Sequence, residues 1–186
     1  MAAVKPREYI LKDGRRATIC SAQISDAEGV LEQIKSVFVE REYTVTTIDD
    51  DMSDFTVDKE KEWVKRHIEE PGHLLIVAEV DDRIIGSADL HNGNRKRTRH
   101  VGTLGITVIK DFRGLGVGEA LMETLLGWAS DNPLIEKISL EVLDINKPAI
   151  GLYNKLGFIE EGKKVKEIKL GQDSYADNIL MYKFVE

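Results

Sequence analysis

The sequence predicts an α+β domain in which helices flank a mixed, mostly antiparallel β-sheet. Short apolar, partly β-branched runs bounded by turn residues alternate with longer segments whose apolar residues recur at helical spacing. One strand–helix–strand unit, residues 101–142, would place two neighbouring strands in parallel. The 186 residues suit a single domain, 1–186, because no repeat, linker or low-complexity segment divides the chain.

The first part of the chain predicts a hairpin followed by two helices. Residues 8–22 hold two short apolar runs on either side of an Asp13-Gly14 turn signal. Ser25-Asp26 is a candidate N-cap, and the helix after it has four apolar residues at helical spacing: Val30, Ile34, Val37 and Phe38. A second helix should begin near Val57 and end at the Glu70-Pro71-Gly72 stop.

The middle and the end of the chain supply most of the predicted sheet. Residues 74–80 and 84–90 should form an antiparallel pair, and a polar connector at 91–100 leads to a strand at 101–108. Beyond these, we expect a helix opened by residues 114–118, a strand at 135–142, a helix at 147–156 closed by Gly157, and strands near 158–168 and 175–184.

Charge and composition exclude several classes of protein. With 26 basic and 33 acidic residues the formal net charge is −7, so we expect no nucleic-acid partner. Cys20 is the single cysteine, and no histidine pair has the spacing of a metal-binding motif, so the sequence predicts no metal. The sequence has neither the apolar core of a signal peptide nor an apolar run of about 18 residues, so we expect a cytoplasmic protein with no membrane partner.

The glycine-dense turn at 114–118 is the first candidate site. Between a strand and a helix it would expose backbone N–H groups at a helix N-terminus, a geometry that binds phosphate oxygens. It is not a Walker A loop, because Glu119-Ala120 follows Gly118, and it lacks the Gly-x-Gly-x-x-Gly spacing of a Rossmann fingerprint. Taken alone, the turn could also be a helix cap without a ligand.

The surrounding motifs resemble those of the GCN5-related N-acetyltransferase (GNAT) superfamily. Arg113-x-x-Gly116-x-Gly118, directly after the strand at 104–108, is similar to its pyrophosphate loop. Downstream, the strand ending in Leu140-Glu141-Val142 is followed by the family's second pattern, which here consists of Asn146, Ala149, Leu152-Tyr153 and Leu156-Gly157-Phe158. The ending at 171–181 is similar to the last hairpin of many members. The resemblance covers roughly residues 74–184.

The resemblance implies a sheet with splayed central strands and acetyl-CoA as the co-substrate. Backbone groups of Ile106, Thr107 and Val108 would pair with the pantetheine arm, and an N–H near Val108 could polarise the thioester carbonyl. The pyrophosphate would lie on seven loop residues: Arg113, Gly114, Leu115, Gly116, Val117, Gly118 and Glu119. Asn146 would contact the cofactor, although it could also cap the helix that follows it.

Two residues are candidates for proton transfer. By resemblance, Tyr153 would protonate the departing CoA thiolate, or else only pack its helix onto the sheet. Glu141 would take the proton of the attacking amine if burial raises its pKa, with Glu79 as a second candidate and water as an alternative.

The predicted activity is therefore transfer of an acetyl group to a primary amine of a small molecule or a protein N-terminus, in a possible homodimer. A non-catalytic acyl-CoA sensor or interaction module of the same fold is the alternative.

Two charged segments remain open in the sequence. The segment 49–54 holds four carboxylates and could draw in a cationic amine, or it could be a solvated loop whose Asp54 or Thr56 caps the next helix. The basic cluster at 95–99 could reach the CoA 3′-phosphate or an acidic substrate, or simply be solvated.

Overall fold

The α+β fold is confirmed by a computed structural model that describes residues 3–47 and 49–185. In chain order its strands and α-helices are β1 (Arg7–Ile10), β2 (Arg16–Ser21), α1 (Ala27–Glu40), α2 (Val57–Glu69), β3 (Leu74–Val80), β4 (Arg83–Asn92), β5 (Val101–Val108), α3 (Val117–Ser130), β6 (Lys137–Leu143), α4 (Lys147–Lys155), β7 (Ile159–Lys169) and β8 (Tyr175–Phe184). Each corresponds to an element that the sequence predicts. The strand expected from residue 135 begins at Lys137, because the N–H of Ile135 donates to the carbonyl of Asn132 in a turn.

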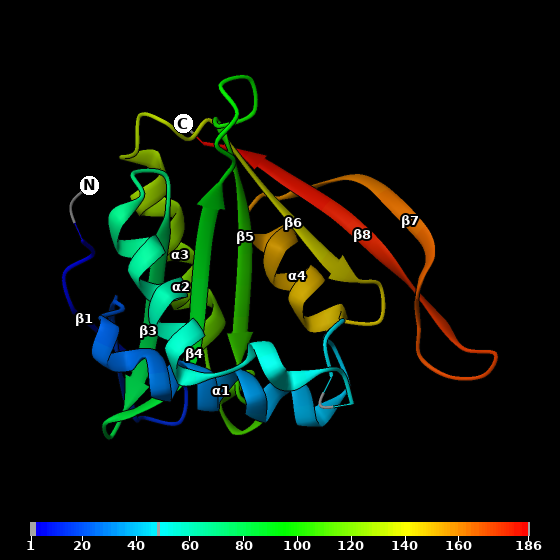
Figure 1. Ribbon diagram of the computed structural model, residues 1–186, viewed down its shortest axis with the longest axis horizontal. Helices are drawn as coiled ribbons and strands as arrows, with labels where there is room; N and C mark the ends of the chain where they lie inside the picture. Colours follow the sequence, from blue (N-terminus) through cyan, green and yellow to red (C-terminus); the bar gives the residue numbers. More distant parts are fainter. Residues whose placement is uncertain (1–2, 48, 186) are drawn as a thin grey trace.

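Within the described residues, the strands form one eight-stranded mixed sheet in the order β1-β2-β3-β4-β5-β6-β8-β7. Every neighbouring pair is antiparallel except β5 and β6. The parallel pairing runs only from Val101 opposite Lys137 to Thr103 opposite Ser139. β5 and β6 then diverge, as Figure 1 shows, so the predicted splay of the central strands is confirmed.

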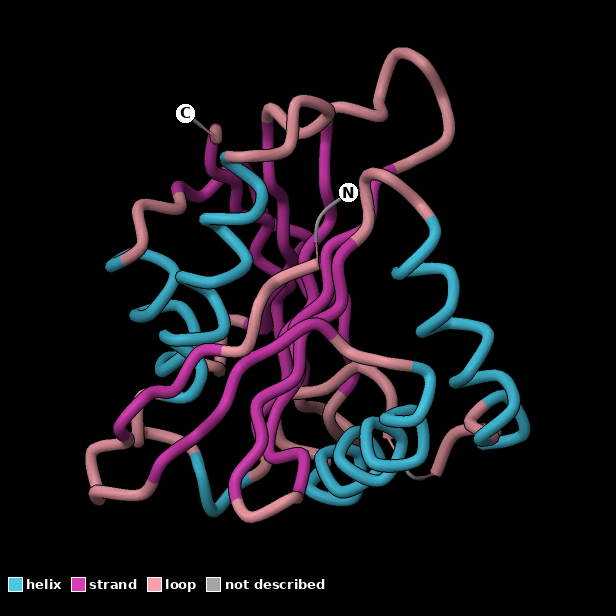
Figure 2. The backbone as a smooth tube through the Cα atoms, turned by 90° about the vertical axis from the view of Figure 1, so that its left-hand side faces the viewer, coloured by secondary structure: helices cyan, strands magenta, loops and turns pink. Residues whose placement is uncertain are grey.

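Helices cover both faces of the sheet (Figure 2). On one face α3 and α4 pack over a large apolar core that includes Ile85, Leu121 and Ile138, all fully buried. On the other face α1 and α2 pack over a smaller core around Val64 and Val77. Because side chains alternate along a strand, β3 and β4 contribute to both cores, and this fixes their register.

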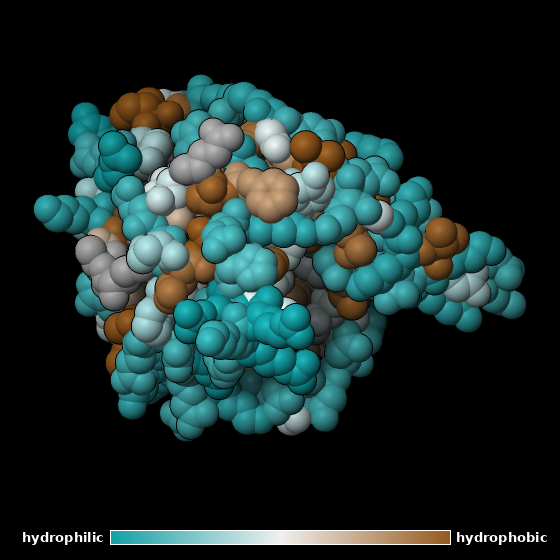
Figure 3. Space-filling view, turned by 90° about the horizontal axis from the view of Figure 1, so that it is seen from above, coloured by the Kyte–Doolittle hydropathy of each residue, from teal (hydrophilic) through white to brown (hydrophobic). Residues whose placement is uncertain are grey.

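Two further features describe the outside of the molecule. The hairpin of β7 and β8 projects beyond the helices (Figure 1), and Val165 on it is 70% exposed. The end of the molecule that carries the β4–β5 connection is largely hydrophilic, with small scattered apolar groups (Figure 3). Among residues 3–47 and 49–185, no helix combines the length and the apolarity that a membrane crossing requires.

Candidate active site

The glycine-rich turn lies between the end of β5 and the N-terminus of α3. Gly114 and Gly116 have φ angles of 74° and 100°, in the left-handed region that favours glycine. The first hydrogen bond of α3 runs from Ala120 N to Gly116 O at 3.0 Å. The N–H groups of residues 117–119 therefore precede the helical ladder and are oriented outward from the helix end. Such an end can bind the oxygens of a phosphate group.

Apolar contacts and one backbone hydrogen bond hold this turn in place. Val117 is 1% exposed in the core, and the carbonyl of Leu115 accepts a hydrogen bond from Lys12 N at 3.1 Å. An added Cβ at Gly118 would lie 3.4 Å from Leu152 Cδ2 and 4.0 Å from Ile106 Cδ1. The start of α3, the middle of α4 and the diverging part of β5 therefore meet at one place.

The side chain of Arg113 points away from the helix N-terminus. Its Nε donates to the carbonyl of Val108 at 2.9 Å, and its Nη1 lies 2.6 Å from Glu40 Oε2 at the end of α1. This arrangement ties the last residue of β5 to α1. If Arg113 contributes to an anion site as the resemblance implies, its backbone is the part that lies in the turn.

Glu119 places a carboxylate in the first turn of α3, where a phosphate would approach. Its Oε1 lies 2.5 Å from Lys155 Nζ of α4. The lysine offsets the negative charge of Glu119, so this carboxylate does not leave the helix end with an uncompensated repulsion towards an anion.

The three predicted residues of β5 are oriented in alternate directions. Ile106 and Val108 are half-buried against the core beneath α3 and α4. Thr107 faces α1, where its Oγ1 accepts from Gln33 Nε2 at 3.1 Å and lies 3.2 Å from Ser87 Oγ. Gln33 is only 3% exposed. This network occupies the Thr107 side chain and leaves the backbone of β5 as the part that can face a ligand at the divergence.

Tyr153 lies on α4 beside this divergence and is 6% exposed. Its ring centroid is 5.9 Å from that of Phe158. Burial raises the pKa of the Tyr153 phenol to about 12. The hydroxyl is therefore protonated at neutral pH, as a proton donor must be.

Asn146 has the capping role that the sequence left open. Its Oδ1 accepts from Ala149 N at 3.2 Å at the start of α4, and Pro148 in the first turn is compatible with that position. The cap fixes the start of the helix that carries Tyr153. Contact of Asn146 with the cofactor stays a prediction.

Glu141 lies on β6 on the face opposite Tyr153, and its carboxylate is already engaged. Lys164 Nζ donates to one oxygen at 2.8 Å, and Asn178 Nδ2 donates to the other. The Glu141 side chain is 48% exposed.

Glu79, the second candidate base, lies on β3, two strands from β5, and burial together with Asp26 and Asp82 raises its pKa. Its position does not bring it to the divergence of β5 and β6.

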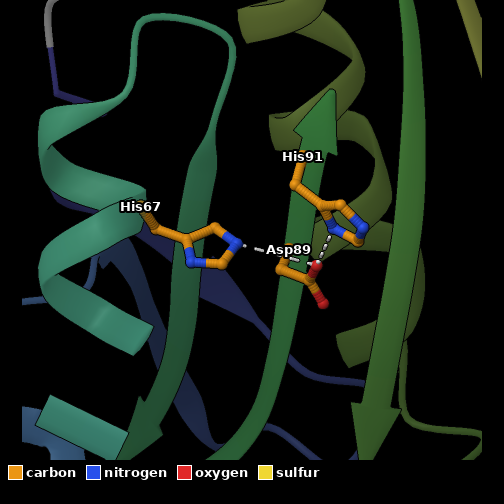
Figure 4. A group of neighbouring side chains, drawn as sticks. All are labelled: His67, Asp89 and His91. Atoms are coloured by element: carbon orange, nitrogen blue, oxygen red, sulfur yellow. Dashed lines mark hydrogen bonds and ion pairs between the residues drawn. The ribbon is translucent and has the colours of Figure 1, made fainter. Parts of the chain in front are cut away.

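A cluster that sequence reasoning missed lies on the α1 and α2 face. His67 of α2 points at Asp89 and His91 of β4, as Figure 4 shows. Glu60 and His73 lie close to it: burial, and then the charge of Asp89, raise the pKa of Glu60 to about 7, and the ring centroid of His73 is 5.2 Å from that of His67. The signal available in the sequence was Asp89-x-His91, two polar residues on one face of a strand.

The two charged segments differ in position. The basic loop at 95–99 lies before β5 and the glycine turn lies after it, and eight strand residues separate them by roughly 24 Å. The loop is therefore not beside the candidate phosphate site.

In the acidic segment, Asp49 pairs with Arg41 at 2.6 Å, Asp50 accepts from Thr47 N at 2.6 Å, and Asp51 accepts from Ser53 N at 2.9 Å.

Known structures and sequences resemble this chain closely. An acetyltransferase of the GNAT family from Streptococcus pneumoniae superposes with a TM-score of 0.86 at 25% identity, covering 91% of this chain and 99% of its own. The structure of YncA from Salmonella typhimurium with its cofactor acetyl-CoA superposes with a TM-score of 0.78 at 17% identity, covering 91% and 94%. The fold is thus that of an acetyltransferase.

Sequence comparison gives the family. The Acetyltransferase (GNAT) family matches residues 34–158. The L-amino acid N-acetyltransferase AaaT of Escherichia coli is 32% identical over 119 residues, which are 64% of this chain and 73% of AaaT. The N-alpha-acetyltransferase of Sulfolobus acidocaldarius is 31% identical over 121 residues, 60% of this chain and 67% of its own. The chain belongs to the GNAT family and is an acyl-CoA-dependent N-acetyltransferase.

Proposed function

We propose that this enzyme moves an acetyl group from acetyl-CoA directly to a primary amine, with Tyr153 as the general acid. The observation that carries the proposal is the meeting of three parts at the place where β5 leaves β6. These are the free N–H groups at the start of α3, the unpaired edge of β5 and the buried phenol on α4.

Two of these parts, the glycine turn and the edge of β5, bind the co-substrate. The turn from Arg113 to Glu119 holds the pyrophosphate through backbone N–H groups, which need no side-chain movement to do so. The edge of β5 at 106–108 pairs with the amides of the pantetheine arm. An N–H near Val108 donates to the thioester carbonyl and stabilises the oxyanion that forms when the amine attacks.

The reaction forms one C–N bond and breaks one C–S bond. The amine nitrogen attacks the thioester carbonyl, and the tetrahedral intermediate collapses with departure of the CoA thiolate. Tyr153 gives its proton to that sulfur, and the proton lost by the amine goes to a base. Glu141 is the base proposed from the sequence; because Lys164 and Asn178 already occupy its oxygens, we propose a water between it and the amine.

The acceptor we propose carries an α-amino group. One relative is named for L-amino acids and another for the N-alpha position, and both names suggest an amino group on the carbon next to a carbonyl group. Free amino acids and protein N-termini are therefore the two acceptor classes to compare. We also propose a cytoplasmic location and a homodimer.

The test is release of free thiol from acetyl-CoA with matched panels of L-amino acids and of tetrapeptides with the same first residue. For Tyr153→Phe we expect kcat to fall by about 10²- to 10⁴-fold with acetyl-CoA affinity unchanged, because only the proton donor is lost. Full kcat in this variant would assign Tyr153 to packing alone. Acetyl-CoA binding without thiol release on any amine would instead support the non-catalytic sensor.

A further inference from the structure

Three donor atoms outside the acetyl-transfer site converge between α2 and β4. His67 Nε2, Asp89 Oδ2 and His91 Nδ1 all lie within 4.8 Å of one another. The Asp89 oxygen is 3.1 Å from His91 Nδ1 and 3.8 Å from His67 Nε2. Figure 4 shows both imidazole rings directed at the Asp89 carboxylate.

The orientation of His67 is fixed by its other ring nitrogen. Nδ1 lies 2.9 Å from the carbonyl oxygen of Trp63, one helical turn earlier, and a carbonyl can only accept. Nδ1 therefore carries the proton, and Nε2 of the neutral ring presents a lone pair. The His67 side chain is 2% exposed, and within the described residues Nε2 has no hydrogen-bond partner. A buried lone pair thus faces a carboxylate oxygen, and a cation held between the two would satisfy both.

The surroundings are suited to a cation. Among the described residues Asp89 has ion-pair contacts with His67 and His91 and with no lysine or arginine. A Cβ at Gly105, its neighbour on β5, would lie 2.5 Å from Asp89 Oδ1, so the glycine leaves room for this carboxylate. The hydrogen bond from His67 Nδ1 to the carbonyl of Trp63 is the kind of outer contact that holds a ligating ring in metal sites.

We propose that His67, Asp89 and His91 bind one divalent transition-metal ion of the Zn²⁺ class. Two imidazoles and one carboxylate suit Zn²⁺, Co²⁺ or Fe²⁺ rather than Mg²⁺ or Ca²⁺, which prefer oxygen ligands. Bonds of about 2.0–2.2 Å place tetrahedral ligands roughly 3.3–3.6 Å apart. The two histidine atoms lie 3.8 Å and 3.1 Å from the Asp89 oxygen, and all three donor atoms lie within 4.8 Å of one another. His91, whose side chain is 48% exposed, can rotate to complete the site and leaves a coordination position open to water.

The site stands apart from the groups proposed for acetyl transfer. Asp89 is paired with Gly105 and His91 with Thr103, on the sheet face covered by α1 and α2, whereas Tyr153 belongs to the core beneath α3 and α4. A bound ion would link α2 to β4. Metal binding therefore can be measured without acetyl-CoA, and its failure would leave the proposed acetyl transfer untouched.

The experiment uses the full, tag-free chain after removal of metal with a chelator. Calorimetry with ZnCl₂ should show one Zn²⁺ bound per chain. CoCl₂ should produce the visible absorption bands of a four-coordinate Co²⁺ site. His91→Ala and Asp89→Asn should each weaken Zn²⁺ binding by at least about 10-fold. His100→Ala, a histidine outside the cluster, is the matched control and should bind like the unchanged protein.

Circular dichroism establishes that each variant is folded, and His91→Ala, at a half-exposed position, keeps the test valid if Asp89→Asn, at a more buried position, fails to fold. No Zn²⁺ binding by the folded wild-type chain would overturn the proposal. One-site binding that persists in both His91→Ala and Asp89→Asn would overturn it as well.

Discussion

The two ends of strand β5 show how one strand can serve both stability and function. Val101 to Thr103 are paired with β6, and Gly102 and Thr103 are paired with β4 as well. From Leu104 to Val108 the strand is paired with β4 alone. The paired end completes the sheet, and the open end exposes backbone groups beside the glycine turn. Substitutions at the paired end should therefore change stability, and those near the open end should change binding and turnover.

The largest effect expected near the open end is that of Gly116→Val. A β-branched residue is strained at a φ of 100°, and its side chain would stand where an anion approaches the start of α3. We expect acetyl-CoA affinity to fall by at least about 100-fold in calorimetry. Gly127→Ala, within the same helix and with nothing within 4 Å of its added Cβ, is the control and should keep wild-type affinity. Unchanged affinity in a folded Gly116→Val would place the site elsewhere.

Because of Tyr153, which also lies near the open end, the free energy of unfolding should fall at alkaline pH. The Tyr153 pKa of about 12 in the folded chain lies above the ordinary value of 10.0, so between these values the unfolded chain loses a proton that the folded chain keeps. Stability is then complete below pH 10 and falls as the pH rises towards 12, by about 2–3 kcal/mol in all. Urea unfolding at pH 9, 10 and 11 measures how steeply the free energy of unfolding falls with pH. In Tyr153→Phe this fall should be smaller, because the contribution of the phenol is gone.

At the paired end, Gly102→Ala tests the opposite expectation. An added Cβ would lie 2.8 Å from Cδ2 of Leu90, which is fully buried and has little room to move. We expect a loss of about 1–3 kcal/mol in the free energy of unfolding. Because this end takes no part in the proposed reaction, kcat per folded molecule should stay unchanged. A fall in kcat without a loss of stability would erase the distinction between the two ends.

The sequence predicted the fold well because its local signals agree with the tertiary structure. Thr56, a candidate cap in the sequence, accepts from Lys59 N at 3.3 Å, and Gly157 has the φ of 84° expected after α4. The divergence of β5 and β6 followed from the family resemblance, since nothing in the apolar pattern of either strand marks where pairing stops. The direction of the Arg113 side chain also lay beyond the sequence, because it depends on Glu40, far away in the chain.

The His67 cluster was missed for the same reason. Sequence motifs for metal sites rely on ligands that are close in the chain, whereas His67 and Asp89 come from a helix and a strand separated by another strand. Only the packing of α2 against the sheet brings them together.

The smallest effect expected is that of the acidic segment at 49–54. Replacement of Asp49, Asp50 and Asp51 with Asn tests whether it draws in a cationic amine. All three carboxylates have partners within the chain, and the hydrogen bond from Ser53 N lowers the pKa of Asp51. Thr56, rather than Asp54, caps α2.

These contacts favour a role in shaping the loop, so we expect kcat/KM for the best amine to change by less than about 3-fold, and its dependence on salt to stay the same. Turnover measured between low and physiological ionic strength checks this. A large fall in kcat/KM that disappears at high salt would instead assign the segment to the attraction of a cationic acceptor.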